Sequence, residues 1–70
     1  MTNDNIRILG IYRGEGWVAS ILYFANGHHR TVDLEYDEAA EFIEAIEANP
    51  DARYEYARAI ARANEKEINA

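Results

Sequence analysis

The sequence predicts an α+β domain in which a three-stranded antiparallel β-meander is followed by two α-helices packed on one face of the sheet (βββαα). Runs of strands followed by runs of helices are typical of this class. The amino-terminal half shows apolar alternation with β-branched and aromatic residues, whereas the carboxy-terminal half has apolar residues at helical spacing. Seventy residues make one domain, residues 1–70. The predicted elements are strands at residues 6–13, 17–25 and 29–36 and helices at residues 37–48 and 50–67.

The dipeptide Asn26-Gly27 predicts the register of the second hairpin. A type I′ turn needs a positive φ at both central residues, and Asn-Gly satisfies this better than other pairs. Counting outward from that turn places Ile21 opposite Val32 and Ala19 opposite Leu34 on one face. We also predict that Trp17 and Tyr36 form a core pair at the end of this face. The other face then pairs Phe24 with His29, Leu22 with Thr31, Ser20 with Asp33, and Val18 with Glu35.

The first predicted helix has one apolar stripe, formed by Ala39, Phe42, Ile43 and Ile46. Asn49 and Pro50 are expected to end that helix and to start the next, with Asn49 as N-cap and Pro50 at the first helical position. We expect the second helix to bury Tyr56, Ala57, Ile60 and either Ala61 or Ala63. Because its alanines are small, another element must approach this helix closely.

The sheet face turned away from the helices is predicted to be apolar. Val18, Leu22 and Phe24 lie on it, and the first strand adds either Ile8 and Tyr12 or Leu9 and Ile11, depending on its register. A contiguous exposed patch of this kind is unusual in a monomer. A helix could cross to cover it, two copies could pack sheet on sheet, or a partner could bind there. We expect partial cover with a residual contact surface.

The net charge of −6 is unevenly distributed. Residues 33–51 hold eight acidic and no basic residues, so the remaining chain has 5 acids against 7 bases. An acidic balance excludes direct binding to nucleic acid or anionic membrane as the main activity, because both need a basic surface. The acids can be a solvated face that keeps the domain soluble, or a surface that imitates nucleic-acid phosphates. The candidate partner-binding residues are Asp33, Glu35, Asp37, Glu38, Glu41, Glu44, Glu47 and Asp51.

The second helix carries a different charge pattern. Arg58, Arg62 and Lys66 recur every four residues, and Glu55 and Glu65 can each reach an arginine three positions away. We interpret this pattern as a salt-bridged, solvated surface.

Catalytic and metal-binding patterns are weak. Ser20 is the only serine and lies in mid-strand without a glycine elbow. His29, Asp33 and Glu35 share a strand face and form the one conceivable metal-binding or catalytic set, for which a solvated strand edge is the simpler interpretation. There are no cysteines, so disulfides and thiolate metal sites are excluded. We therefore predict no enzyme activity, no cofactor and no metal.

Nothing in the first five residues resembles the basic start of a signal peptide, and the longest nearly apolar run, residues 17–25, is too short to span a membrane. We expect a cytoplasmic protein.

The chain as a whole resembles, at the level of class, the small acidic inhibitors that phages make, above all the anti-CRISPR proteins. The residues that carry this resemblance are the acidic run 33–38 and the helical Glu41, Glu44 and Glu47. The resemblance implies a non-enzymatic inhibitor in the host cytoplasm that occupies a DNA-binding surface of a Cas protein or complex through its acidic helix and strand edge. The alternative is a homo-oligomeric accessory or partner-binding module that uses the apolar sheet face.

Overall fold

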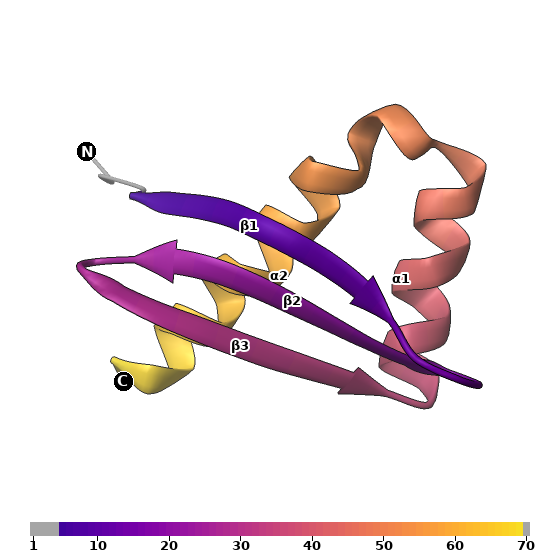
Figure 1. The fold of residues 1–70 in the computed structure, drawn as a ribbon, viewed down its shortest axis with the longest axis horizontal. Helices are drawn as coiled ribbons and strands as arrows, with labels where there is room; N and C mark the ends of the chain where they lie inside the picture. The colour runs from indigo at the N-terminus through magenta and orange to yellow at the C-terminus, as the bar shows by residue number, and fades with distance from the viewer. Residues whose placement is uncertain (1–4, 70) are drawn as a thin grey trace.

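A computed structural model describes residues 5–69 and confirms the βββαα arrangement (Figure 1). The sheet has the order β1-β2-β3 and both strand pairs are antiparallel. Residues 1–4, on which the expected absence of a signal peptide partly rests, lie outside the described residues. The elements are β1 (Ile6–Arg13), β2 (Val18–Ala25), β3 (His28–Glu35), α1 (Asp37–Ala48), the 3-10 turn η1 (Pro50–Ala52) and α2 (Arg53–Ile68).

The hairpin between β2 and β3 has the predicted turn and the predicted register. Asn26 and Gly27 have φ values of 53° and 82°, the left-handed conformation that this turn requires. Ile21 pairs with Val32, and Ala19 pairs with Leu34. The alternation of β2 is therefore confirmed, with every second residue of the strand fully buried.

Strand β1 follows neither of the two registers considered from the sequence, because it contains a bulge. The pairing shifts between Ile8, which lies opposite Tyr23, and Gly10, which lies opposite Leu22. Leu9 is the extra residue, so Ile8 and Ile11 both lie on the core face although they are three positions apart.

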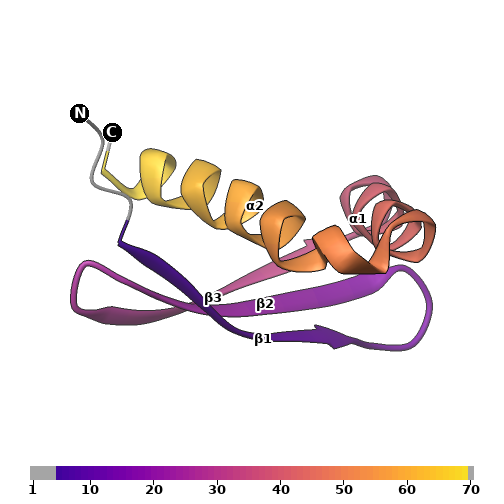
Figure 2. The same cartoon turned by 90° about the horizontal axis from the view of Figure 1, so that it is seen from above.

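Both helices lie on the same side of the sheet. Figure 2 shows two layers, with α2 running along the length of the sheet and α1 standing across one end. Neither helix crosses to the opposite face, so the expected partial cover of that face is wrong. Tyr12 and Val18 on that face remain 57% and 38% exposed, and Leu22 and Phe24 are half-buried.

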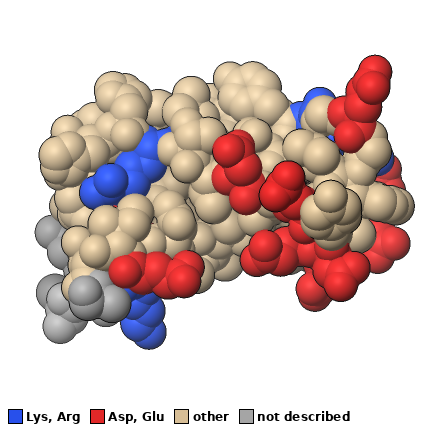
Figure 3. All heavy atoms as spheres, turned by 90° about the horizontal axis from the view of Figure 1, so that it is seen from below, with Lys and Arg blue, Asp and Glu red and all other residues tan. Residues whose placement is uncertain are grey.

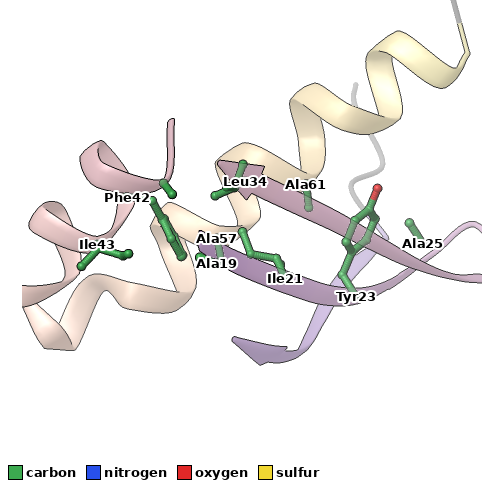
Figure 4. Close-up of a cluster of buried hydrophobic side chains, with 10 residues drawn as sticks. Ala19, Ile21, Tyr23, Ala25, Leu34, Phe42, Ile43, Ala57 and Ala61 are labelled. Atoms are coloured by element: carbon green, nitrogen blue, oxygen red, sulfur yellow. The ribbon is translucent and has the colours of Figure 1, made fainter. Parts of the chain in front are cut away.

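The core lies between β2 and the two helices (Figure 4). Ile21 and Tyr23 are the largest completely buried side chains, and Ala57 and Ala61 of α2 lie against them. Two alanines four residues apart present a flat surface, which lets α2 approach the sheet closely. Phe42 and Ile43 of α1 close the other end of this core, as the predicted apolar stripe required.

The predicted core pair of Trp17 and Tyr36 is wrong. The two residues are joined through the backbone, since the Tyr36 amide donates to the Trp17 carbonyl at 3.0 Å. Their side chains are nevertheless 49% and 78% exposed. Tyr36 has a φ of 56°, because the chain turns there from β3 into α1, and strand alternation therefore ends one residue earlier.

The junction between the helices differs in detail from the prediction. Pro50 does occupy a first helical position, but the turn that it starts is the 3-10 turn η1, and α2 begins at Arg53. The Asn49 side chain forms no cap hydrogen bond. Instead the Ala52 amide donates to the Asn49 carbonyl at 3.1 Å, and the Arg53 guanidinium donates to the Pro50 carbonyl at 2.9 Å.

Candidate partner-binding surface

All eight acidic residues of the segment 33–51 are exposed. Figure 3 looks at the molecule from the side on which β3 forms the sheet edge, and shows acidic side chains gathered at the end that α1 occupies. We call this region the acidic end; it consists of Asp33, Glu35, Asp37, Glu38, Glu41, Glu44, Glu47 and Asp51.

The acidic end is not a single row of carboxylates. Glu47 lies on the β1 side of α1, where the Arg13 guanidinium pairs with it at 3.2 Å. Asp33 lies on the outer sheet face, where the Ser20 hydroxyl donates to its carboxylate at 2.7 Å. Glu38 and Glu41 lie on the opposite side of α1 from Glu47 and border a groove. The carboxylates therefore surround α1, and only part of them face any one direction.

The groove has a volume of about 590 Å³ and lies between the β3 edge, α1 and α2. Its floor is apolar and includes Leu34, Phe42 and Ile60, while Ala63 of α2 leaves one side open. Glu38 and Glu41 border it on α1, and Glu67 borders it on α2. An apolar floor with a charged rim resembles the apolar core and polar rim of protein interfaces.

A buried polar cluster was not predicted from the sequence. The Tyr23 hydroxyl donates to Glu65 Oε2 at 2.7 Å, and the Asn64 amide donates to the Tyr23 hydroxyl at 2.7 Å. The Arg30 Nε atom forms an ion pair with the same Glu65 oxygen. Glu65 is only 6% exposed, so the interpretation of this residue as part of a solvated surface is wrong.

The environment of Tyr23 favours its neutral form. Burial raises the pKa of the Tyr23 hydroxyl above its ordinary value of 10.0, since the phenolate would lose its hydration. The adjacent Glu65 carboxylate raises this pKa further, while the Asn64 hydrogen bond and the Arg30 charge lower it. The hydroxyl is thus held as a hydrogen-bond donor, which is a structural role.

One pattern could have revealed this cluster. Ala57, Ala61 and Glu65 are spaced by four residues, so the buried stripe of α2 continues directly onto Glu65. Arg30 lies opposite Tyr23 in the confirmed register, which places a cation beside the strand position that faces α2.

The set of His29, Asp33 and Glu35, which the sequence offered as a conceivable metal-binding or catalytic site, does not form a cluster of metal ligands among the described residues. His29 packs edge-on against Phe24, with ring centroids 5.0 Å apart. Within residues 5–69 no three His, Asp or Glu side chains are grouped so that they could hold a metal ion. No described helix combines the length and the apolar character that crossing a membrane requires.

Comparison of the chain with known proteins finds no matching family model, no matching curated protein and no matching solved structure. The candidate function therefore depends on the geometry and charge of the acidic end and of the groove.

Proposed function

We propose that this protein is a non-enzymatic inhibitor that binds a basic nucleic-acid-binding protein through its acidic end and thereby occupies the nucleic-acid surface of that target. The observation that carries the proposal is the exposure of all eight acidic residues in segment 33–51. Among the described residues, Glu47 alone of these eight forms an ion pair with a cation.

The spacing of these acids suits a surface that normally contacts phosphates. The acids of α1 run from Asp37 to Glu47. They extend over about 15 Å of helix axis, because each residue adds roughly 1.5 Å. Five carboxylates lie over that length but point to several sides of α1. A basic partner on one side therefore meets part of this charge, which has the sign but a lower density than the phosphates of a nucleic-acid strand, one per roughly 3.4 Å. Complementary charge would steer encounter with a basic partner and would make binding salt-dependent.

Beyond the first turn of α1, where acids favour the helix dipole, Glu41 and Glu44 are exposed at positions at which neutral residues would serve helix stability better. Like charges three or four residues apart in a helix destabilise it by roughly 0.2–0.5 kcal/mol per pair. The α1 acids at positions 38, 41 and 44 follow this spacing and contribute nothing to the core. The class-level resemblance to anti-CRISPR proteins suggests a Cas protein or complex as the target.

The proposal is tested by capture from a nuclease-treated cell lysate, followed by a gel-shift assay on each captured nucleic-acid-binding protein. We expect addition of this protein to displace the nucleic acid from its target. The triple substitution Glu38→Gln, Glu41→Gln, Glu44→Gln should abolish displacement, because it removes charge without altering the core.

The matched control changes the net charge by the same three units elsewhere, through Glu15→Lys and Glu55→Gln at exposed positions outside the acidic end and the groove. This control should retain most of the displacement activity. If this control and the triple variant lose activity equally, only net charge matters, and a specific role for the acidic end is contradicted. If captured targets keep their nucleic acid bound, inhibition by occupancy is contradicted.

A second candidate function is a homo-oligomeric module that uses the uncovered sheet face. The observation in its favour is the exposure of Leu9, Tyr12 and Val18 beside the half-buried Leu22 and Phe24. Light scattering during size-exclusion chromatography distinguishes the two functions. A dimer that Leu22→Asp converts to a folded monomer supports the module, and a monomeric native protein at high concentration contradicts it.

A further inference from the structure

We infer that the groove between the β3 edge, α1 and α2 receives an apolar anchor side chain from a basic segment of the partner protein. The inference rests on the proposed function, because it assumes a basic partner, and it adds the place and the chemistry of the contact. The occupant is an amphipathic segment in which a large apolar side chain is flanked by lysines or arginines.

The floor of the groove provides the apolar half of this recognition. Leu34 and Phe42 form part of the main core and are 4% exposed, so they are held rigidly from behind. Tyr56 and Ile60 are only partly buried and complete the floor from α2. A concave apolar surface on rigid elements is where an anchor residue of a protein partner gains most from desolvation.

Small side chains keep the groove open. Ala59 and Ala63 lie on the groove side of α2 and are exposed, and Ala45 lies on the groove side of α1. A groove volume of about 590 Å³ exceeds that of one large side chain, so the site accommodates an anchor together with part of its backbone. The alanines of α2 thus serve two surfaces, since Ala57 and Ala61 face the sheet instead.

The rim determines the sign of the partner charge. Glu38, Glu41 and Glu67 border the groove from two helices and are exposed. The ion pairs described within residues 5–69 join Arg13 to Glu47 and Arg30 to Glu65, and they do not involve these three carboxylates. Cations that flank the anchor would therefore meet carboxylates on both sides of the groove, which favours a basic over a neutral or acidic segment.

The experiment uses two fluorescein-labelled peptides of equal length and equal positive charge. One peptide has leucines at helical spacing among lysines, and the other has serines in place of the leucines. Fluorescence anisotropy is measured with the full chain at about 50 and about 300 mM salt, where screening separates charge from apolar contact. The groove is filled by Ala63→Trp, and Ala48→Trp adds the same ring at an exposed position of α1 outside the groove.

We expect the leucine peptide to bind more tightly than the serine peptide by about tenfold or more, the factor expected from burying one leucine side chain. Ala63→Trp should remove that advantage while Ala48→Trp preserves it. Amide chemical shifts in an ¹⁵N-labelled sample should change at Leu34, Phe42 and Ala63. Circular dichroism verifies that both variants remain folded.

Three results would overturn the inference. If both peptides bind equally and their affinity depends on salt, the acidic end still binds the partner, but the groove takes no part in binding. A leucine advantage that survives Ala63→Trp, or chemical shifts confined to Val18, Leu22 and Phe24, would move the contact to the outer sheet face. If neither peptide binds, the proposed function is contradicted as well.

Discussion

The Tyr23 hydroxyl donates a 2.7 Å hydrogen bond to Glu65 Oε2 across a separation of 42 residues. This bond connects the middle strand of the sheet to the last turns of α2. Arg30 pairs with Glu65 and Asn64 with Tyr23, whose side chain lies away from α1 in Figure 4, while the second Glu65 oxygen, Oε1, is buried without a hydrogen-bond partner. Ala57 and Ala61 are too small to interlock with the sheet, so we expect the directional polar contacts of this cluster to contribute to the position of α2 along its axis.

Glu65→Leu should lower the free energy of unfolding by about 1–3 kcal/mol, because it leaves the Tyr23 hydroxyl and the Arg30 guanidinium without their acceptor. Urea denaturation followed by circular dichroism measures the change. Glu55→Leu on the same helix is the control, since Glu55 is exposed and its replacement should change stability by less than about 0.5 kcal/mol. Equal effects of the two substitutions would show that the cluster contributes nothing.

Tyr23→Phe should reduce the loss of stability at alkaline pH. The pKa of Tyr23 is raised in the folded state. The contribution of its neutral hydroxyl to the free energy of unfolding is therefore fully present below pH 10.0 and disappears as the pH rises through the raised value. In the native protein the phenolate absorbance of one tyrosine should appear at higher pH than in the unfolded chain, and Tyr23→Phe should remove that delayed component. Tyr36→Phe, at a 78% exposed position, should leave it in place.

Gly27→Ala should destabilise the protein by about 1 kcal/mol, since a side chain in the left-handed region strains the backbone. No atom lies within 4 Å of the added Cβ, so the cost is conformational alone. Gly14→Ala is the matched control, because its Cβ would make an ordinary 3.4 Å contact with Val18 and its φ lies outside the left-handed region. Thermal unfolding that responds equally to both changes would contradict the type I′ turn.

Arg13→Gln should change stability by less than about 1 kcal/mol, since the Arg13–Glu47 pair is more than half exposed on both sides and surface pairs contribute little. It should nevertheless strengthen binding to a basic partner, because it releases the Glu47 carboxylate. Affinity for a captured target, measured at low and high salt, checks the effect. Weaker binding after Arg13→Gln would show that Arg13 itself contacts the partner.

Local chemistry determines the parts of the fold that could be predicted from the sequence. The Asn26-Gly27 turn fixes one hairpin, and the pairs that follow from it are present in the sheet, except for Trp17 with Tyr36 at its far end. The apolar spacing of α1 likewise identifies the side that packs on the core. In each case a short-range rule and the burial of apolar surface favour the same arrangement.

The errors arise where one residue interrupts a regular period. Alternation predicts that Tyr36 continues the core face, but its positive φ ends the strand and turns its ring outward. Leu9 interrupts the period of β1 in the same way. In the buried polar cluster, helical spacing alone does not show whether Glu65 meets solvent or Tyr23, because that depends on which strand α2 crosses.

The bulge at Leu9 makes the two edges of the sheet unequal. An edge strand is a template on which another chain can add by hydrogen bonding, and an irregular, strongly twisted edge resists such addition. Strand β1 carries this irregularity, whereas the pairing of β3 with β2 is continuous over all eight residues of β3. Unwanted strand-to-strand assembly between copies is thus hindered at β1, and the acids at positions 33 and 35 on β3 repel a second copy there by charge.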